Sequence, residues 1–343
     1  MVDVKSILMR VRADEKQSLS ALRLICAGFT FAALVFALIA VALDDTFYLR
    51  LASEALILAG MAISVDLLLG ITGLLSLGQA LFFGLGAYSS ALLLIHLTQN
   101  FWLVVVTVVA GAVPVSLIFG WIAIRSRGVY FALITFGYAQ VISRIIYNTR
   151  SVGASDGIVG VPLISIPLPF FEIPINDPVA FFLFLLVVIV AIVLALWWLM
   201  DTPFGRVFPA MRVNEDRLPF IGYNVRAYMI AMYVLAAVIA ALFGALYPML
   251  RGFVSPELMF FEMSGNALIM VILGGVGTII GPVLGAIILT IIKSIVGSFT
   301  EHHLIVIGGI FIALVLFFPK GLTGFLRLRV EALMRRRREE IQS

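Results

Sequence analysis

Uninterrupted apolar runs of about 20 residues recur along the whole chain, and they constrain its fold more than any other feature. Each run is long enough to cross a hydrocarbon core of about 30 Å as a single α-helix. Charged residues make up only 12% of the chain, whereas soluble domains carry about 25%. The runs also lack the alternation that is typical of a membrane β-barrel. The sequence therefore predicts an all-α protein, a polytopic transmembrane helical bundle.

We expect about ten membrane spans, each formed by one apolar run. The runs lie at residues 24–43, 51–70, 80–96, 101–124, 129–147, 179–200, 227–250 and 304–318, and at 263–293, which divides near 274–282 into two pieces. If the glycine-rich pieces re-enter the membrane without crossing it, the count falls to about eight, and this alternative stays open.

The two ends of the chain predict its orientation. Residues 1–23 are too charged and too long before the first apolar run to be a cleaved signal peptide, so we expect a tail on the cytoplasmic side. Residues 321–343 form a second basic tail, with arginines at 335–338, and the positive-inside rule places it in the cytoplasm too. Between the tails, residues 24–320 form the transmembrane domain, and residues 148–178 are predicted to be a long periplasmic loop.

Residues 201–228 form a long charged insertion between two apolar runs, with four arginines and three acids. Such a segment has to lie in water at the cytoplasmic face, because charges are costly in hydrocarbon. Thr202 followed by Pro203 predicts a helix start, and Asn214 predicts a second helix that ends at Gly222. We expect one or two short helices that a soluble partner can push. The alternative is a basic loop that only fixes the topology.

Two apolar regions are broken by glycines, one in each half of the chain. They read GITGLLSLGQALFFGLGAY at residues 70–88 and SGNALIMVILGGVGTIIGPVLGA at 264–286. Paired interrupted helices are typical of inverted-repeat transporters, in which they line the path, so Gly73 and Gly78 are path candidates. The spacing of Gly277, Gly281 and Gly285 by four predicts one small helix face for close packing. Both regions could instead be packing seams only.

Polar side chains inside the spans are few, and each is a candidate for a functional role. For Asp66 two interpretations stay open, a lining of an aqueous cavity or a structural hydrogen bond to a freed backbone amide. Glu54 and Arg144 share a depth and could form a structural pair. The remaining candidates for the translocation path are the polar residues Thr72, Gln79 and Asn266 and the aromatic residues Phe82, Phe83, Tyr88, Tyr130 and Tyr138.

Signatures of enzymes are missing from the sequence. It contains no HExxH, no GxxxxGK[ST] and no cluster of cysteines and histidines. We therefore expect no catalytic residue, no metal and no cofactor, and the charge pattern gives no reason to expect nucleic acid. If ATP drives transport, the ATPase has to be a separate chain.

Several motifs in the same order resemble a known transporter family. They are the first broken region continued as SSALL, then RGVYFALITFGYAQ, SDGIVGVP, TPFGRVFPAMRVNEDRLPFIGYN and MVILGGVGTIIGPVLGA. Together they resemble the permease subunits of branched-chain amino-acid ABC importers, of the LivM type. The resemblance implies a protein of the bacterial inner membrane that works with a LivH-like second permease, two cytoplasmic ATPase subunits and a periplasmic solute-binding protein.

By the same resemblance, residues 204–222 are the segment that couples the permease to the ATPase, within a coupling loop at 201–227. The positions that match the family's motif are Phe204, Arg206, Arg212, Asn214, Glu215 and Gly222. Pro209 and Pro219 depart from it and predict two very short helices with a kink, because proline inside a helix removes a hydrogen bond.

Relatives that resemble importers of urea, short amides or aromatic acids share these motifs, so the solute is left open. A self-sufficient ion-coupled transporter is the alternative from a different class. It would need an acid near the midplane, and only Asp66 is suitable.

Overall fold

The computed structural model describes residues 46–167, 172–299 and 321–324, together with ten single positions between residues 28 and 35 and between 305 and 316. Its α-helices are α2 (Thr46–Asp66), α3 (Gln79–His96), α4 (Phe101–Ala123), α5 (Val129–Asn148), α6 (Pro178–Asp201), α7 (Val207–Val213), α8 (Val225–Arg251), α9 (Phe261–Gly274) and α10 (Gly281–Phe299). A π-helical turn, η1 (Leu67–Thr72), continues α2, and 3-10 turns form η2 (Arg150–Val152), η3 (Ala154–Asp156), η4 (Glu215–Ile221) and η5 (Pro256–Met259).

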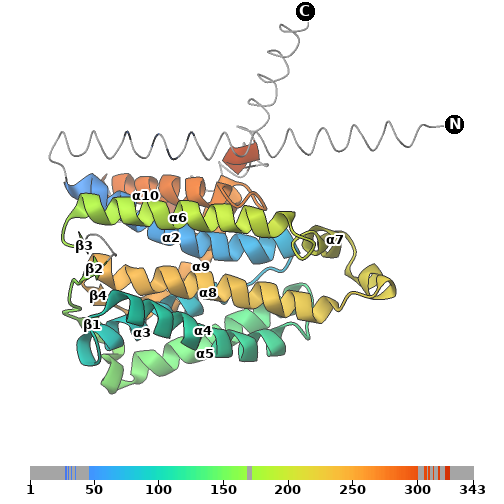
Figure 1. Cartoon of the computed structure of the whole chain (residues 1–343), viewed down its shortest axis with the longest axis horizontal. Helices are drawn as coiled ribbons and strands as arrows, with labels where there is room; N and C mark the ends of the chain where they lie inside the picture. The colour runs from blue at the N-terminus through green and yellow to red at the C-terminus, as the bar shows by residue number, and fades with distance from the viewer. Residues whose placement is uncertain are drawn as a thin grey trace, which may run out of the picture.

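The long helices lie side by side in a bundle (Figure 1). Helices α10, α6 and α2 lie along one side, α8 and α9 in the middle, and α4 and α5 along the other side. The short strands gather at one end of the bundle, and α7 and η4 lie at the opposite end. The loops between the long helices are therefore sorted to two ends, as expected of a bundle that crosses a membrane.

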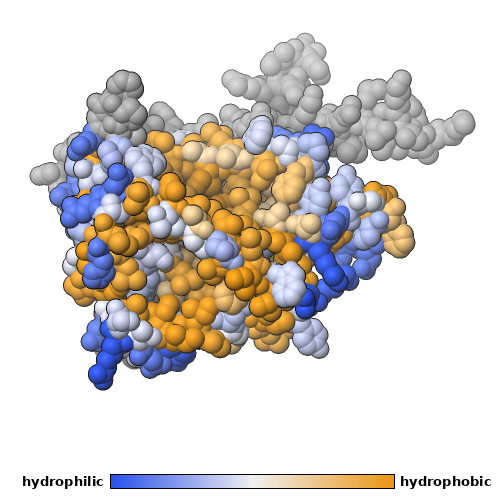
Figure 2. Space-filling model, turned by 60° about the horizontal axis from the view of Figure 1, so that its bottom comes forward, coloured by the Kyte–Doolittle hydropathy of each residue, from blue (hydrophilic) through white to orange (hydrophobic). Residues whose placement is uncertain are grey.

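Apolar side chains cover much of the lateral surface of the bundle. Exposed examples on α4 and α6 are Val106, Ile118, Val187 and Leu194. Figure 2 shows apolar residues over the middle of one face, with hydrophilic residues gathered towards both ends. Such a belt would be unfavourable in water, whereas lipid tails solvate it without cost. The surface agrees with the composition, and the chain is a multi-pass membrane protein.

Seven described helices are long and apolar enough to span a membrane, and α9 is a shorter apolar helix. The predicted runs from 51–70 to 227–250 coincide with these helices to within a few residues, except that α2 begins five residues earlier. The predicted spans 24–43 and 304–318 and both tails lie almost entirely outside the described residues. The count of ten spans and the cytoplasmic placement of both ends therefore remain predictions.

Two short strand pairs, which the sequence did not indicate, lie in or next to the predicted outer loop of this mostly helical bundle. Strand β1 (Ile158–Val159) pairs with β4 (Phe253–Val254), and β2 (Ser165–Pro167) pairs with β3 (Glu172–Pro174), both antiparallel. The backbone amides and carbonyls of a long loop need hydrogen-bond partners, and these short strand pairs supply some of them. The first pair also fastens this loop to the end of α8.

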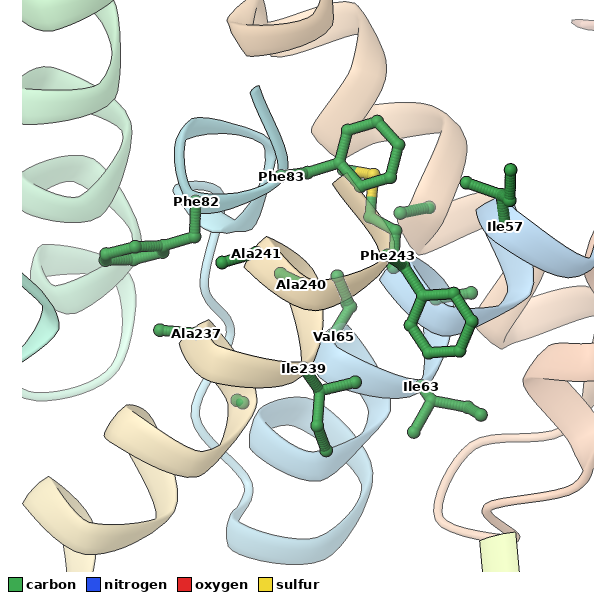
Figure 3. Packing of buried hydrophobic residues seen from close by; sticks show 14 of the residues in the cluster. Ile57, Ile63, Val65, Phe82, Phe83, Ala237, Ile239, Ala240, Ala241 and Phe243 are labelled. Atoms are coloured by element: carbon green, nitrogen blue, oxygen red, sulfur yellow. The ribbon is translucent and has the colours of Figure 1, made fainter. Parts of the chain in front are cut away.

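The core forms where α8 passes between α3 and α2 (Figure 3). Small residues allow the close approach. A Cβ atom added at Gly244 of α8 would lie 1.9 Å from the carbonyl oxygen of Phe83, so the two backbones are in direct contact. On the other side Phe243 points towards α2, where a Cβ added at Gly60 would meet its ring at 1.9 Å. Close backbone approach at glycine is the usual basis of helix association in membranes.

This contact predicts that Gly244→Ala destabilises the protein. The added methyl group meets backbone, which cannot rotate away, and such overpacking costs about 1–3 kcal/mol. The thermal unfolding midpoint of the purified protein in detergent should fall by several degrees. Gly111→Ala on α4 is the control, because nothing lies within 4 Å of the added atom there. Equal unfolding midpoints for the two variants would contradict the close α3–α8 packing.

Candidate functional site

The first helix break separates α2 and η1 from α3. Gly73 ends the π-helical turn with a φ of 80°, a left-handed conformation that L side chains rarely adopt. Residues 73–78 are non-helical, and α3 then begins at Gln79. The freed amides find side-chain partners on other helices, since the Leu77 amide donates to Thr135 Oγ1 at 3.1 Å and the Ala80 amide to Ser264 Oγ at 3.2 Å.

The second helix break separates α9 from α10 and depends on Asp66. The carboxylate of Asp66 accepts the backbone amide of Gly277 at 2.6 Å and that of Ile279 at 3.1 Å. Ile279 has a φ of 61°, which is unfavourable for a β-branched residue and persists only where its surroundings enforce it. Asp66 is 1% exposed. This geometry corresponds to the second of the two interpretations, a hydrogen bond to freed backbone amides.

The carbonyls at the second break are also satisfied by side chains. Thr323 Oγ1 donates to the carbonyl of Gly274 at 2.5 Å, and Thr278 Oγ1 donates to that of Gly275 at 2.8 Å. Backbone that is not helical at membrane depth needs such internal partners, because hydrocarbon offers none. The break is thus a fixed turn with its polar groups paired.

The charged loop, residues 202–224 between α6 and α8, folds into the two short helices α7 and η4 as predicted. Asn214 separates them, its Oδ1 accepts the amide of Asp216 at 3.2 Å, and Gly222 ends η4 with a φ of 88°. Thr202 accepts the amide of Gly205 at 3.2 Å. However, the first helix begins only at Val207, so Thr202 stabilises a turn before it rather than its start.

Both prolines of the charged loop fit this local structure. Pro209 is the third residue of α7, where a backbone amide has no partner within the helix in any case. Pro219 lies inside the 3-10 turn η4. The kinked pair of very short helices that these prolines predict is therefore present.

Aromatic side chains anchor the charged loop to the bundle. Phe204 stacks on Tyr228 of α8 with ring centroids 5.1 Å apart, and Phe208 contacts the same tyrosine edge-on at 5.9 Å. Phe208 is fully buried. Arg206 lies next to this anchor at the start of α7 and is exposed.

Arg212 of α7 connects the charged loop to both breaks. Its Nη1 donates to the carbonyl oxygen of Gly70, in the π-helical turn before the first break. The same nitrogen lies 3.5 Å from the position that a Cβ of Gly277 would occupy, in the second break. A guanidinium at carbonyls near the end of a helix is electrostatically favourable. We call the group of Asp66, Gly70, Arg212, Gly277 and Ile279 the three-way junction.

Surface ion pairs link the charged loop to the turn between α4 and α5. Arg127 Nε lies 2.9 Å from Glu215 Oε1, and Arg127 Nη1 lies 3.1 Å from Asp216 Oδ1. Between the loop and this turn lies a cavity of about 740 Å³, beside Arg212. Exposed pairs of this kind contribute about 0–1 kcal/mol, so the buried aromatic contacts and the junction hold the loop more firmly.

The structure places several path candidates together near the first break. A Cβ added at Gly78 would lie 2.6 Å from the Tyr138 hydroxyl, and that hydroxyl hydrogen-bonds to Tyr233 of α8. Gln79 is fully buried, and neither polar atom of its amide has a hydrogen-bond partner among the described residues. Thr72 hydrogen-bonds within its own helix, to the carbonyl of Leu68 at 2.6 Å.

The other path candidates are more scattered. Phe82 and Phe83 are buried in the core, edge-on to Tyr233 and Tyr247 respectively. The remaining three are separate from the first break: Tyr88 is buried further along α3, Tyr130 is 74% exposed at the start of α5, and Asn266 lines a cavity at the strand end of the bundle.

Two predictions, one about a shared helix face and one about an ion pair, are wrong. Gly277 does not share a helix face with Gly281 and Gly285, because it lies in the second break with a φ of 79° while the other two belong to α10. The spacing rule fails because the helix is interrupted between them. Glu54 does not pair with Arg144 but with Arg251, at 2.5 Å, and the Arg144 guanidinium lies over the ring of Phe260.

Gly285 nevertheless lies at a close helix contact, since a Cβ there would be 1.9 Å from the carbonyl oxygen of Met270 in α9. A Cβ at Gly281 would lie 2.3 Å from Thr278 Oγ1 and 2.7 Å from the carbonyl oxygen of Gly275.

Three apolar residues of the charged loop were not among the candidates. Val213, Phe220 and Ile221 are 87%, 89% and 69% exposed. They lie at the end of the bundle opposite the strands (Figure 1). The sequence alone does not separate Phe220 from Phe204 and Phe208 of the same loop, of which Phe208 is fully buried.

Comparisons with known proteins agree with this arrangement. The family described as "Branched-chain amino acid transport system / permease component" matches residues 47–315. The chain belongs to this family. The matched residues include both breaks, the charged loop and all five residues of the three-way junction.

Three relatives illustrate the similarity. The high-affinity branched-chain amino acid transport system permease protein LivM of Escherichia coli (strain K12) is 28% identical over 288 residues, 78% of this chain and 68% of the relative. LivM of Salmonella typhimurium is 27% identical over 298 residues, 81% and 70% of the two chains. The corresponding protein LivH of Escherichia coli (strain K12) is 24% identical over 279 residues, 77% and 90%. No solved structure matches.

Asp66→Asn should loosen the second break. An amide can accept only one of the two backbone N–H groups and presents its own N–H₂ to the other, and a buried unpaired donor costs about 1–3 kcal/mol. Hydrogen exchange at residues 275–280 should become about tenfold faster or more. Thr72→Val is the matched control, because its hydroxyl bonds only within its own helix. Unchanged exchange in Asp66→Asn would show that the carboxylate does not hold the break.

Proposed function

We propose that this chain is the permease subunit of an ABC importer and forms half of the translocation path for branched-chain amino acids. The observation that carries the proposal is the bond from Arg212 to the carbonyl of Gly70, which joins a water-facing loop to the first interrupted helix and places the same guanidinium beside Gly277 in the second. Interrupted helices are the usual elements of a transport path, and a loop fixed to them can transmit force to it.

Charge supports a cytoplasmic position for the charged loop. The end of the bundle that carries α7 has six arginines, Arg125, Arg127, Arg206, Arg212, Arg217 and Arg226, against Arg50, Arg144, Arg150, Arg251 and Lys293 among the described residues towards the strand end. Under the positive-inside rule this end faces the cytoplasm and the strand end faces the periplasm. In the same proposal the protein lies in a bacterial inner membrane, with ten spans and both termini inside.

The mechanism follows from the three-way junction. ATP binding closes two cytoplasmic ATPase subunits, and their movement displaces α7. Because Arg212 bonds η1 and lies against the second break, the displacement reaches both breaks at once. The path then changes between access from outside and from inside. The coupling residues in this scheme are Arg212 and, around it, Phe204, Arg206, Asn214, Glu215 and Gly222.

We place the path near the first break, beside Gly73 and Gly78. The buried amide of Gln79, which has no partner among the described residues, can pair with a polar solute or with water that accompanies it. Thr72 and Tyr138 lie close to the same segment. A LivH-like second permease supplies the other half of the path, and a periplasmic binding protein delivers the solute. Urea, short amides and aromatic acids are the alternative solutes.

A self-sufficient ion-coupled transporter is the rival proposal. It needs an acid that can bind a proton or sodium ion, and the carboxylate of Asp66 is already engaged by two backbone amides. Uptake by this chain alone in ATP-free proteoliposomes under an ion gradient would support the rival. Uptake that requires the ATPase subunits and internal ATP supports the importer.

Arg212→Met should uncouple ATP hydrolysis from uptake in the reconstituted importer. A hydrogen bond from a charged group contributes about 1.5–3 kcal/mol, so uptake per ATP hydrolysed should fall about tenfold or more, while basal ATPase activity persists. Arg226→Met is the matched control, since Arg226 is exposed beside the same cavity, has no ion-pair partner within 4.0 Å among the described residues, and should change the ratio less than about fivefold. Equal ratios in the two variants would mean that the charged loop only fixes the topology.

Phe220→Ala should weaken the attachment of the ATPase subunits. An exposed aromatic residue that fills a partner's pocket is a typical hot spot, and its truncation lowers affinity about 10- to 100-fold. Less ATPase should co-purify with the variant, in contrast to Arg212→Met. Val129→Ala is the control, because Val129 is 72% exposed near the same end but outside the charged loop. Undiminished co-purification with Phe220→Ala would exclude this residue from the contact.

A further inference from the structure

A second cavity lies at the strand end of the bundle, opposite the charged loop. It is an open cavity with a volume of about 720 Å³, lined by residues of α2, α8, η5, α9 and α10. The volume is in the usual range for small-molecule sites. None of the residues of the three-way junction lines it.

The lining of this cavity carries both signs of charge in equal number. Arg50, Arg251 and Lys293 are the cations, and Glu54, Glu257 and Glu262 are the anions. Glu54 and Arg251 satisfy each other in an ion pair at 2.5 Å. Among the described residues Arg50, Lys293, Glu257 and Glu262 have no ion-pair partner within 4.0 Å. Two cations and two anions therefore remain available in one cavity.

Lys293 stands out because of its position on an apolar helix. It is the only charged residue of α10, is half-buried, and lies six residues before the end of that helix. An ionisable side chain inside a span is costly and marks a functional site by default. Among the described residues no carboxylate oxygen lies within 4.0 Å of its ammonium group, and Glu54, which interacts with it electrostatically across the cavity, is paired with Arg251.

Thr290 provides a second and independent observation. It lies one turn before Lys293 on the same face of α10, it is 6% exposed, and it lines the cavity. Its hydroxyl has no hydrogen-bond partner in the described part of the chain. A buried hydroxyl without a partner is unfavourable, so a ligand that pairs with it gains from the contact. Asn266 of α9 faces the same space and adds an amide donor.

Apolar residues complete the lining. Leu58, Leu258 and Met263 contribute hydrocarbon surface, and Leu258 is buried. A fully hydrophilic solute would leave this surface unused. A small molecule with one carboxylate, one ammonium group and an apolar side chain matches all three parts of the lining.

We propose that this cavity is a binding site for a zwitterionic amino acid with an apolar side chain. Lys293, Thr290 and Asn266 bind its carboxylate, and Glu257 or Glu262 binds its ammonium group. The inference rests on the proposed function for its place in transport, where the cavity receives the solute before the path opens. A charged segment of a binding protein is the other possible occupant, but the unpartnered hydroxyl is buried, and a small ligand reaches it more easily.

Equilibrium binding of radiolabelled L-leucine to the full chain in nanodiscs tests the site directly. Two competitors separate the charges, since L-leucinamide lacks the carboxylate and 4-methylpentanoate lacks the ammonium group. We expect saturable binding of L-leucine and competition about tenfold weaker or more by each analogue. Lys293→Met should weaken L-leucine binding about tenfold or more and abolish its advantage over L-leucinamide.

Thr290→Val tests the hydroxyl without a change of shape and should weaken binding several-fold. Thr107→Val on α4 is the matched control, because Thr107 lies outside the cavity and donates to the carbonyl of Leu103. It should bind L-leucine as the unaltered protein does. The retained preference of Lys293→Met for L-leucine over L-leucinamide would overturn the assignment of the carboxylate.

The remaining outcomes separate this inference from the proposed function. Absence of saturable binding up to millimolar concentrations, or unchanged affinity in Lys293→Met and Thr290→Val, overturns the site even if the importer transports L-leucine. If these variants instead raise only the concentration of binding protein needed for uptake, the cavity is a protein contact and the proposal is wrong. If binding follows the prediction but no ATP-driven uptake occurs, the site stands and the proposed function fails.

Discussion

The structure depends on the pairing of backbone groups where two membrane helices are interrupted. Each break exposes amides and carbonyls at a depth where hydrocarbon cannot bond them. At the second break one carboxylate, that of Asp66, accepts two amides at once. The two breaks approach each other closely at Gly70, and this explains the glycine there. A Cβ at Gly70 would lie 2.2 Å from Asp66 Oδ1 and 2.3 Å from the amide nitrogen of Gly277. A side chain there would separate the two breaks and remove the acceptor from its donors.

Because the two breaks meet at Asp66, a single contact from the charged loop can act on both. Arg212 supplies this contact through the carbonyl of Gly70. Phe208, buried against Tyr228, packs α7 onto the first turn of α8. The loop therefore packs against α8 through its aromatic residues and is hydrogen-bonded to the first break through one arginine. In the proposed importer this arrangement converts a push on an exposed surface into a change deep in the membrane.

Local chemistry predicted much of this arrangement from the sequence. The apolar runs gave the long helices, and Asn214 and Gly222 gave the limits of η4, because an Asx cap and a left-handed glycine act within a few residues. The partners of Asp66 are more than 200 residues away in the chain, and periodicity carries no information about such contacts.

The same limit explains the errors. Glu54 was paired with the wrong arginine on depth alone, and Gly277 was placed on a helix that ends before it. Phe220 was passed over because an apolar residue in a membrane protein draws no attention until its exposure is known. Composition identifies apolar residues, whereas their exposure depends on how the loop folds.

The packing of the core indicates where movement can occur. The backbones of α3 and α8 touch at Gly244, and α2 closes on the ring of Phe243 at Gly60. Interiors packed in this way do not deform continuously, since any sliding would drive backbone into backbone. A displacement of α7 can therefore not be absorbed between these three helices. It has to be absorbed at the breaks, where the restraints are two hydrogen bonds that Asp66 accepts and one that Arg212 donates, and these can be exchanged one at a time.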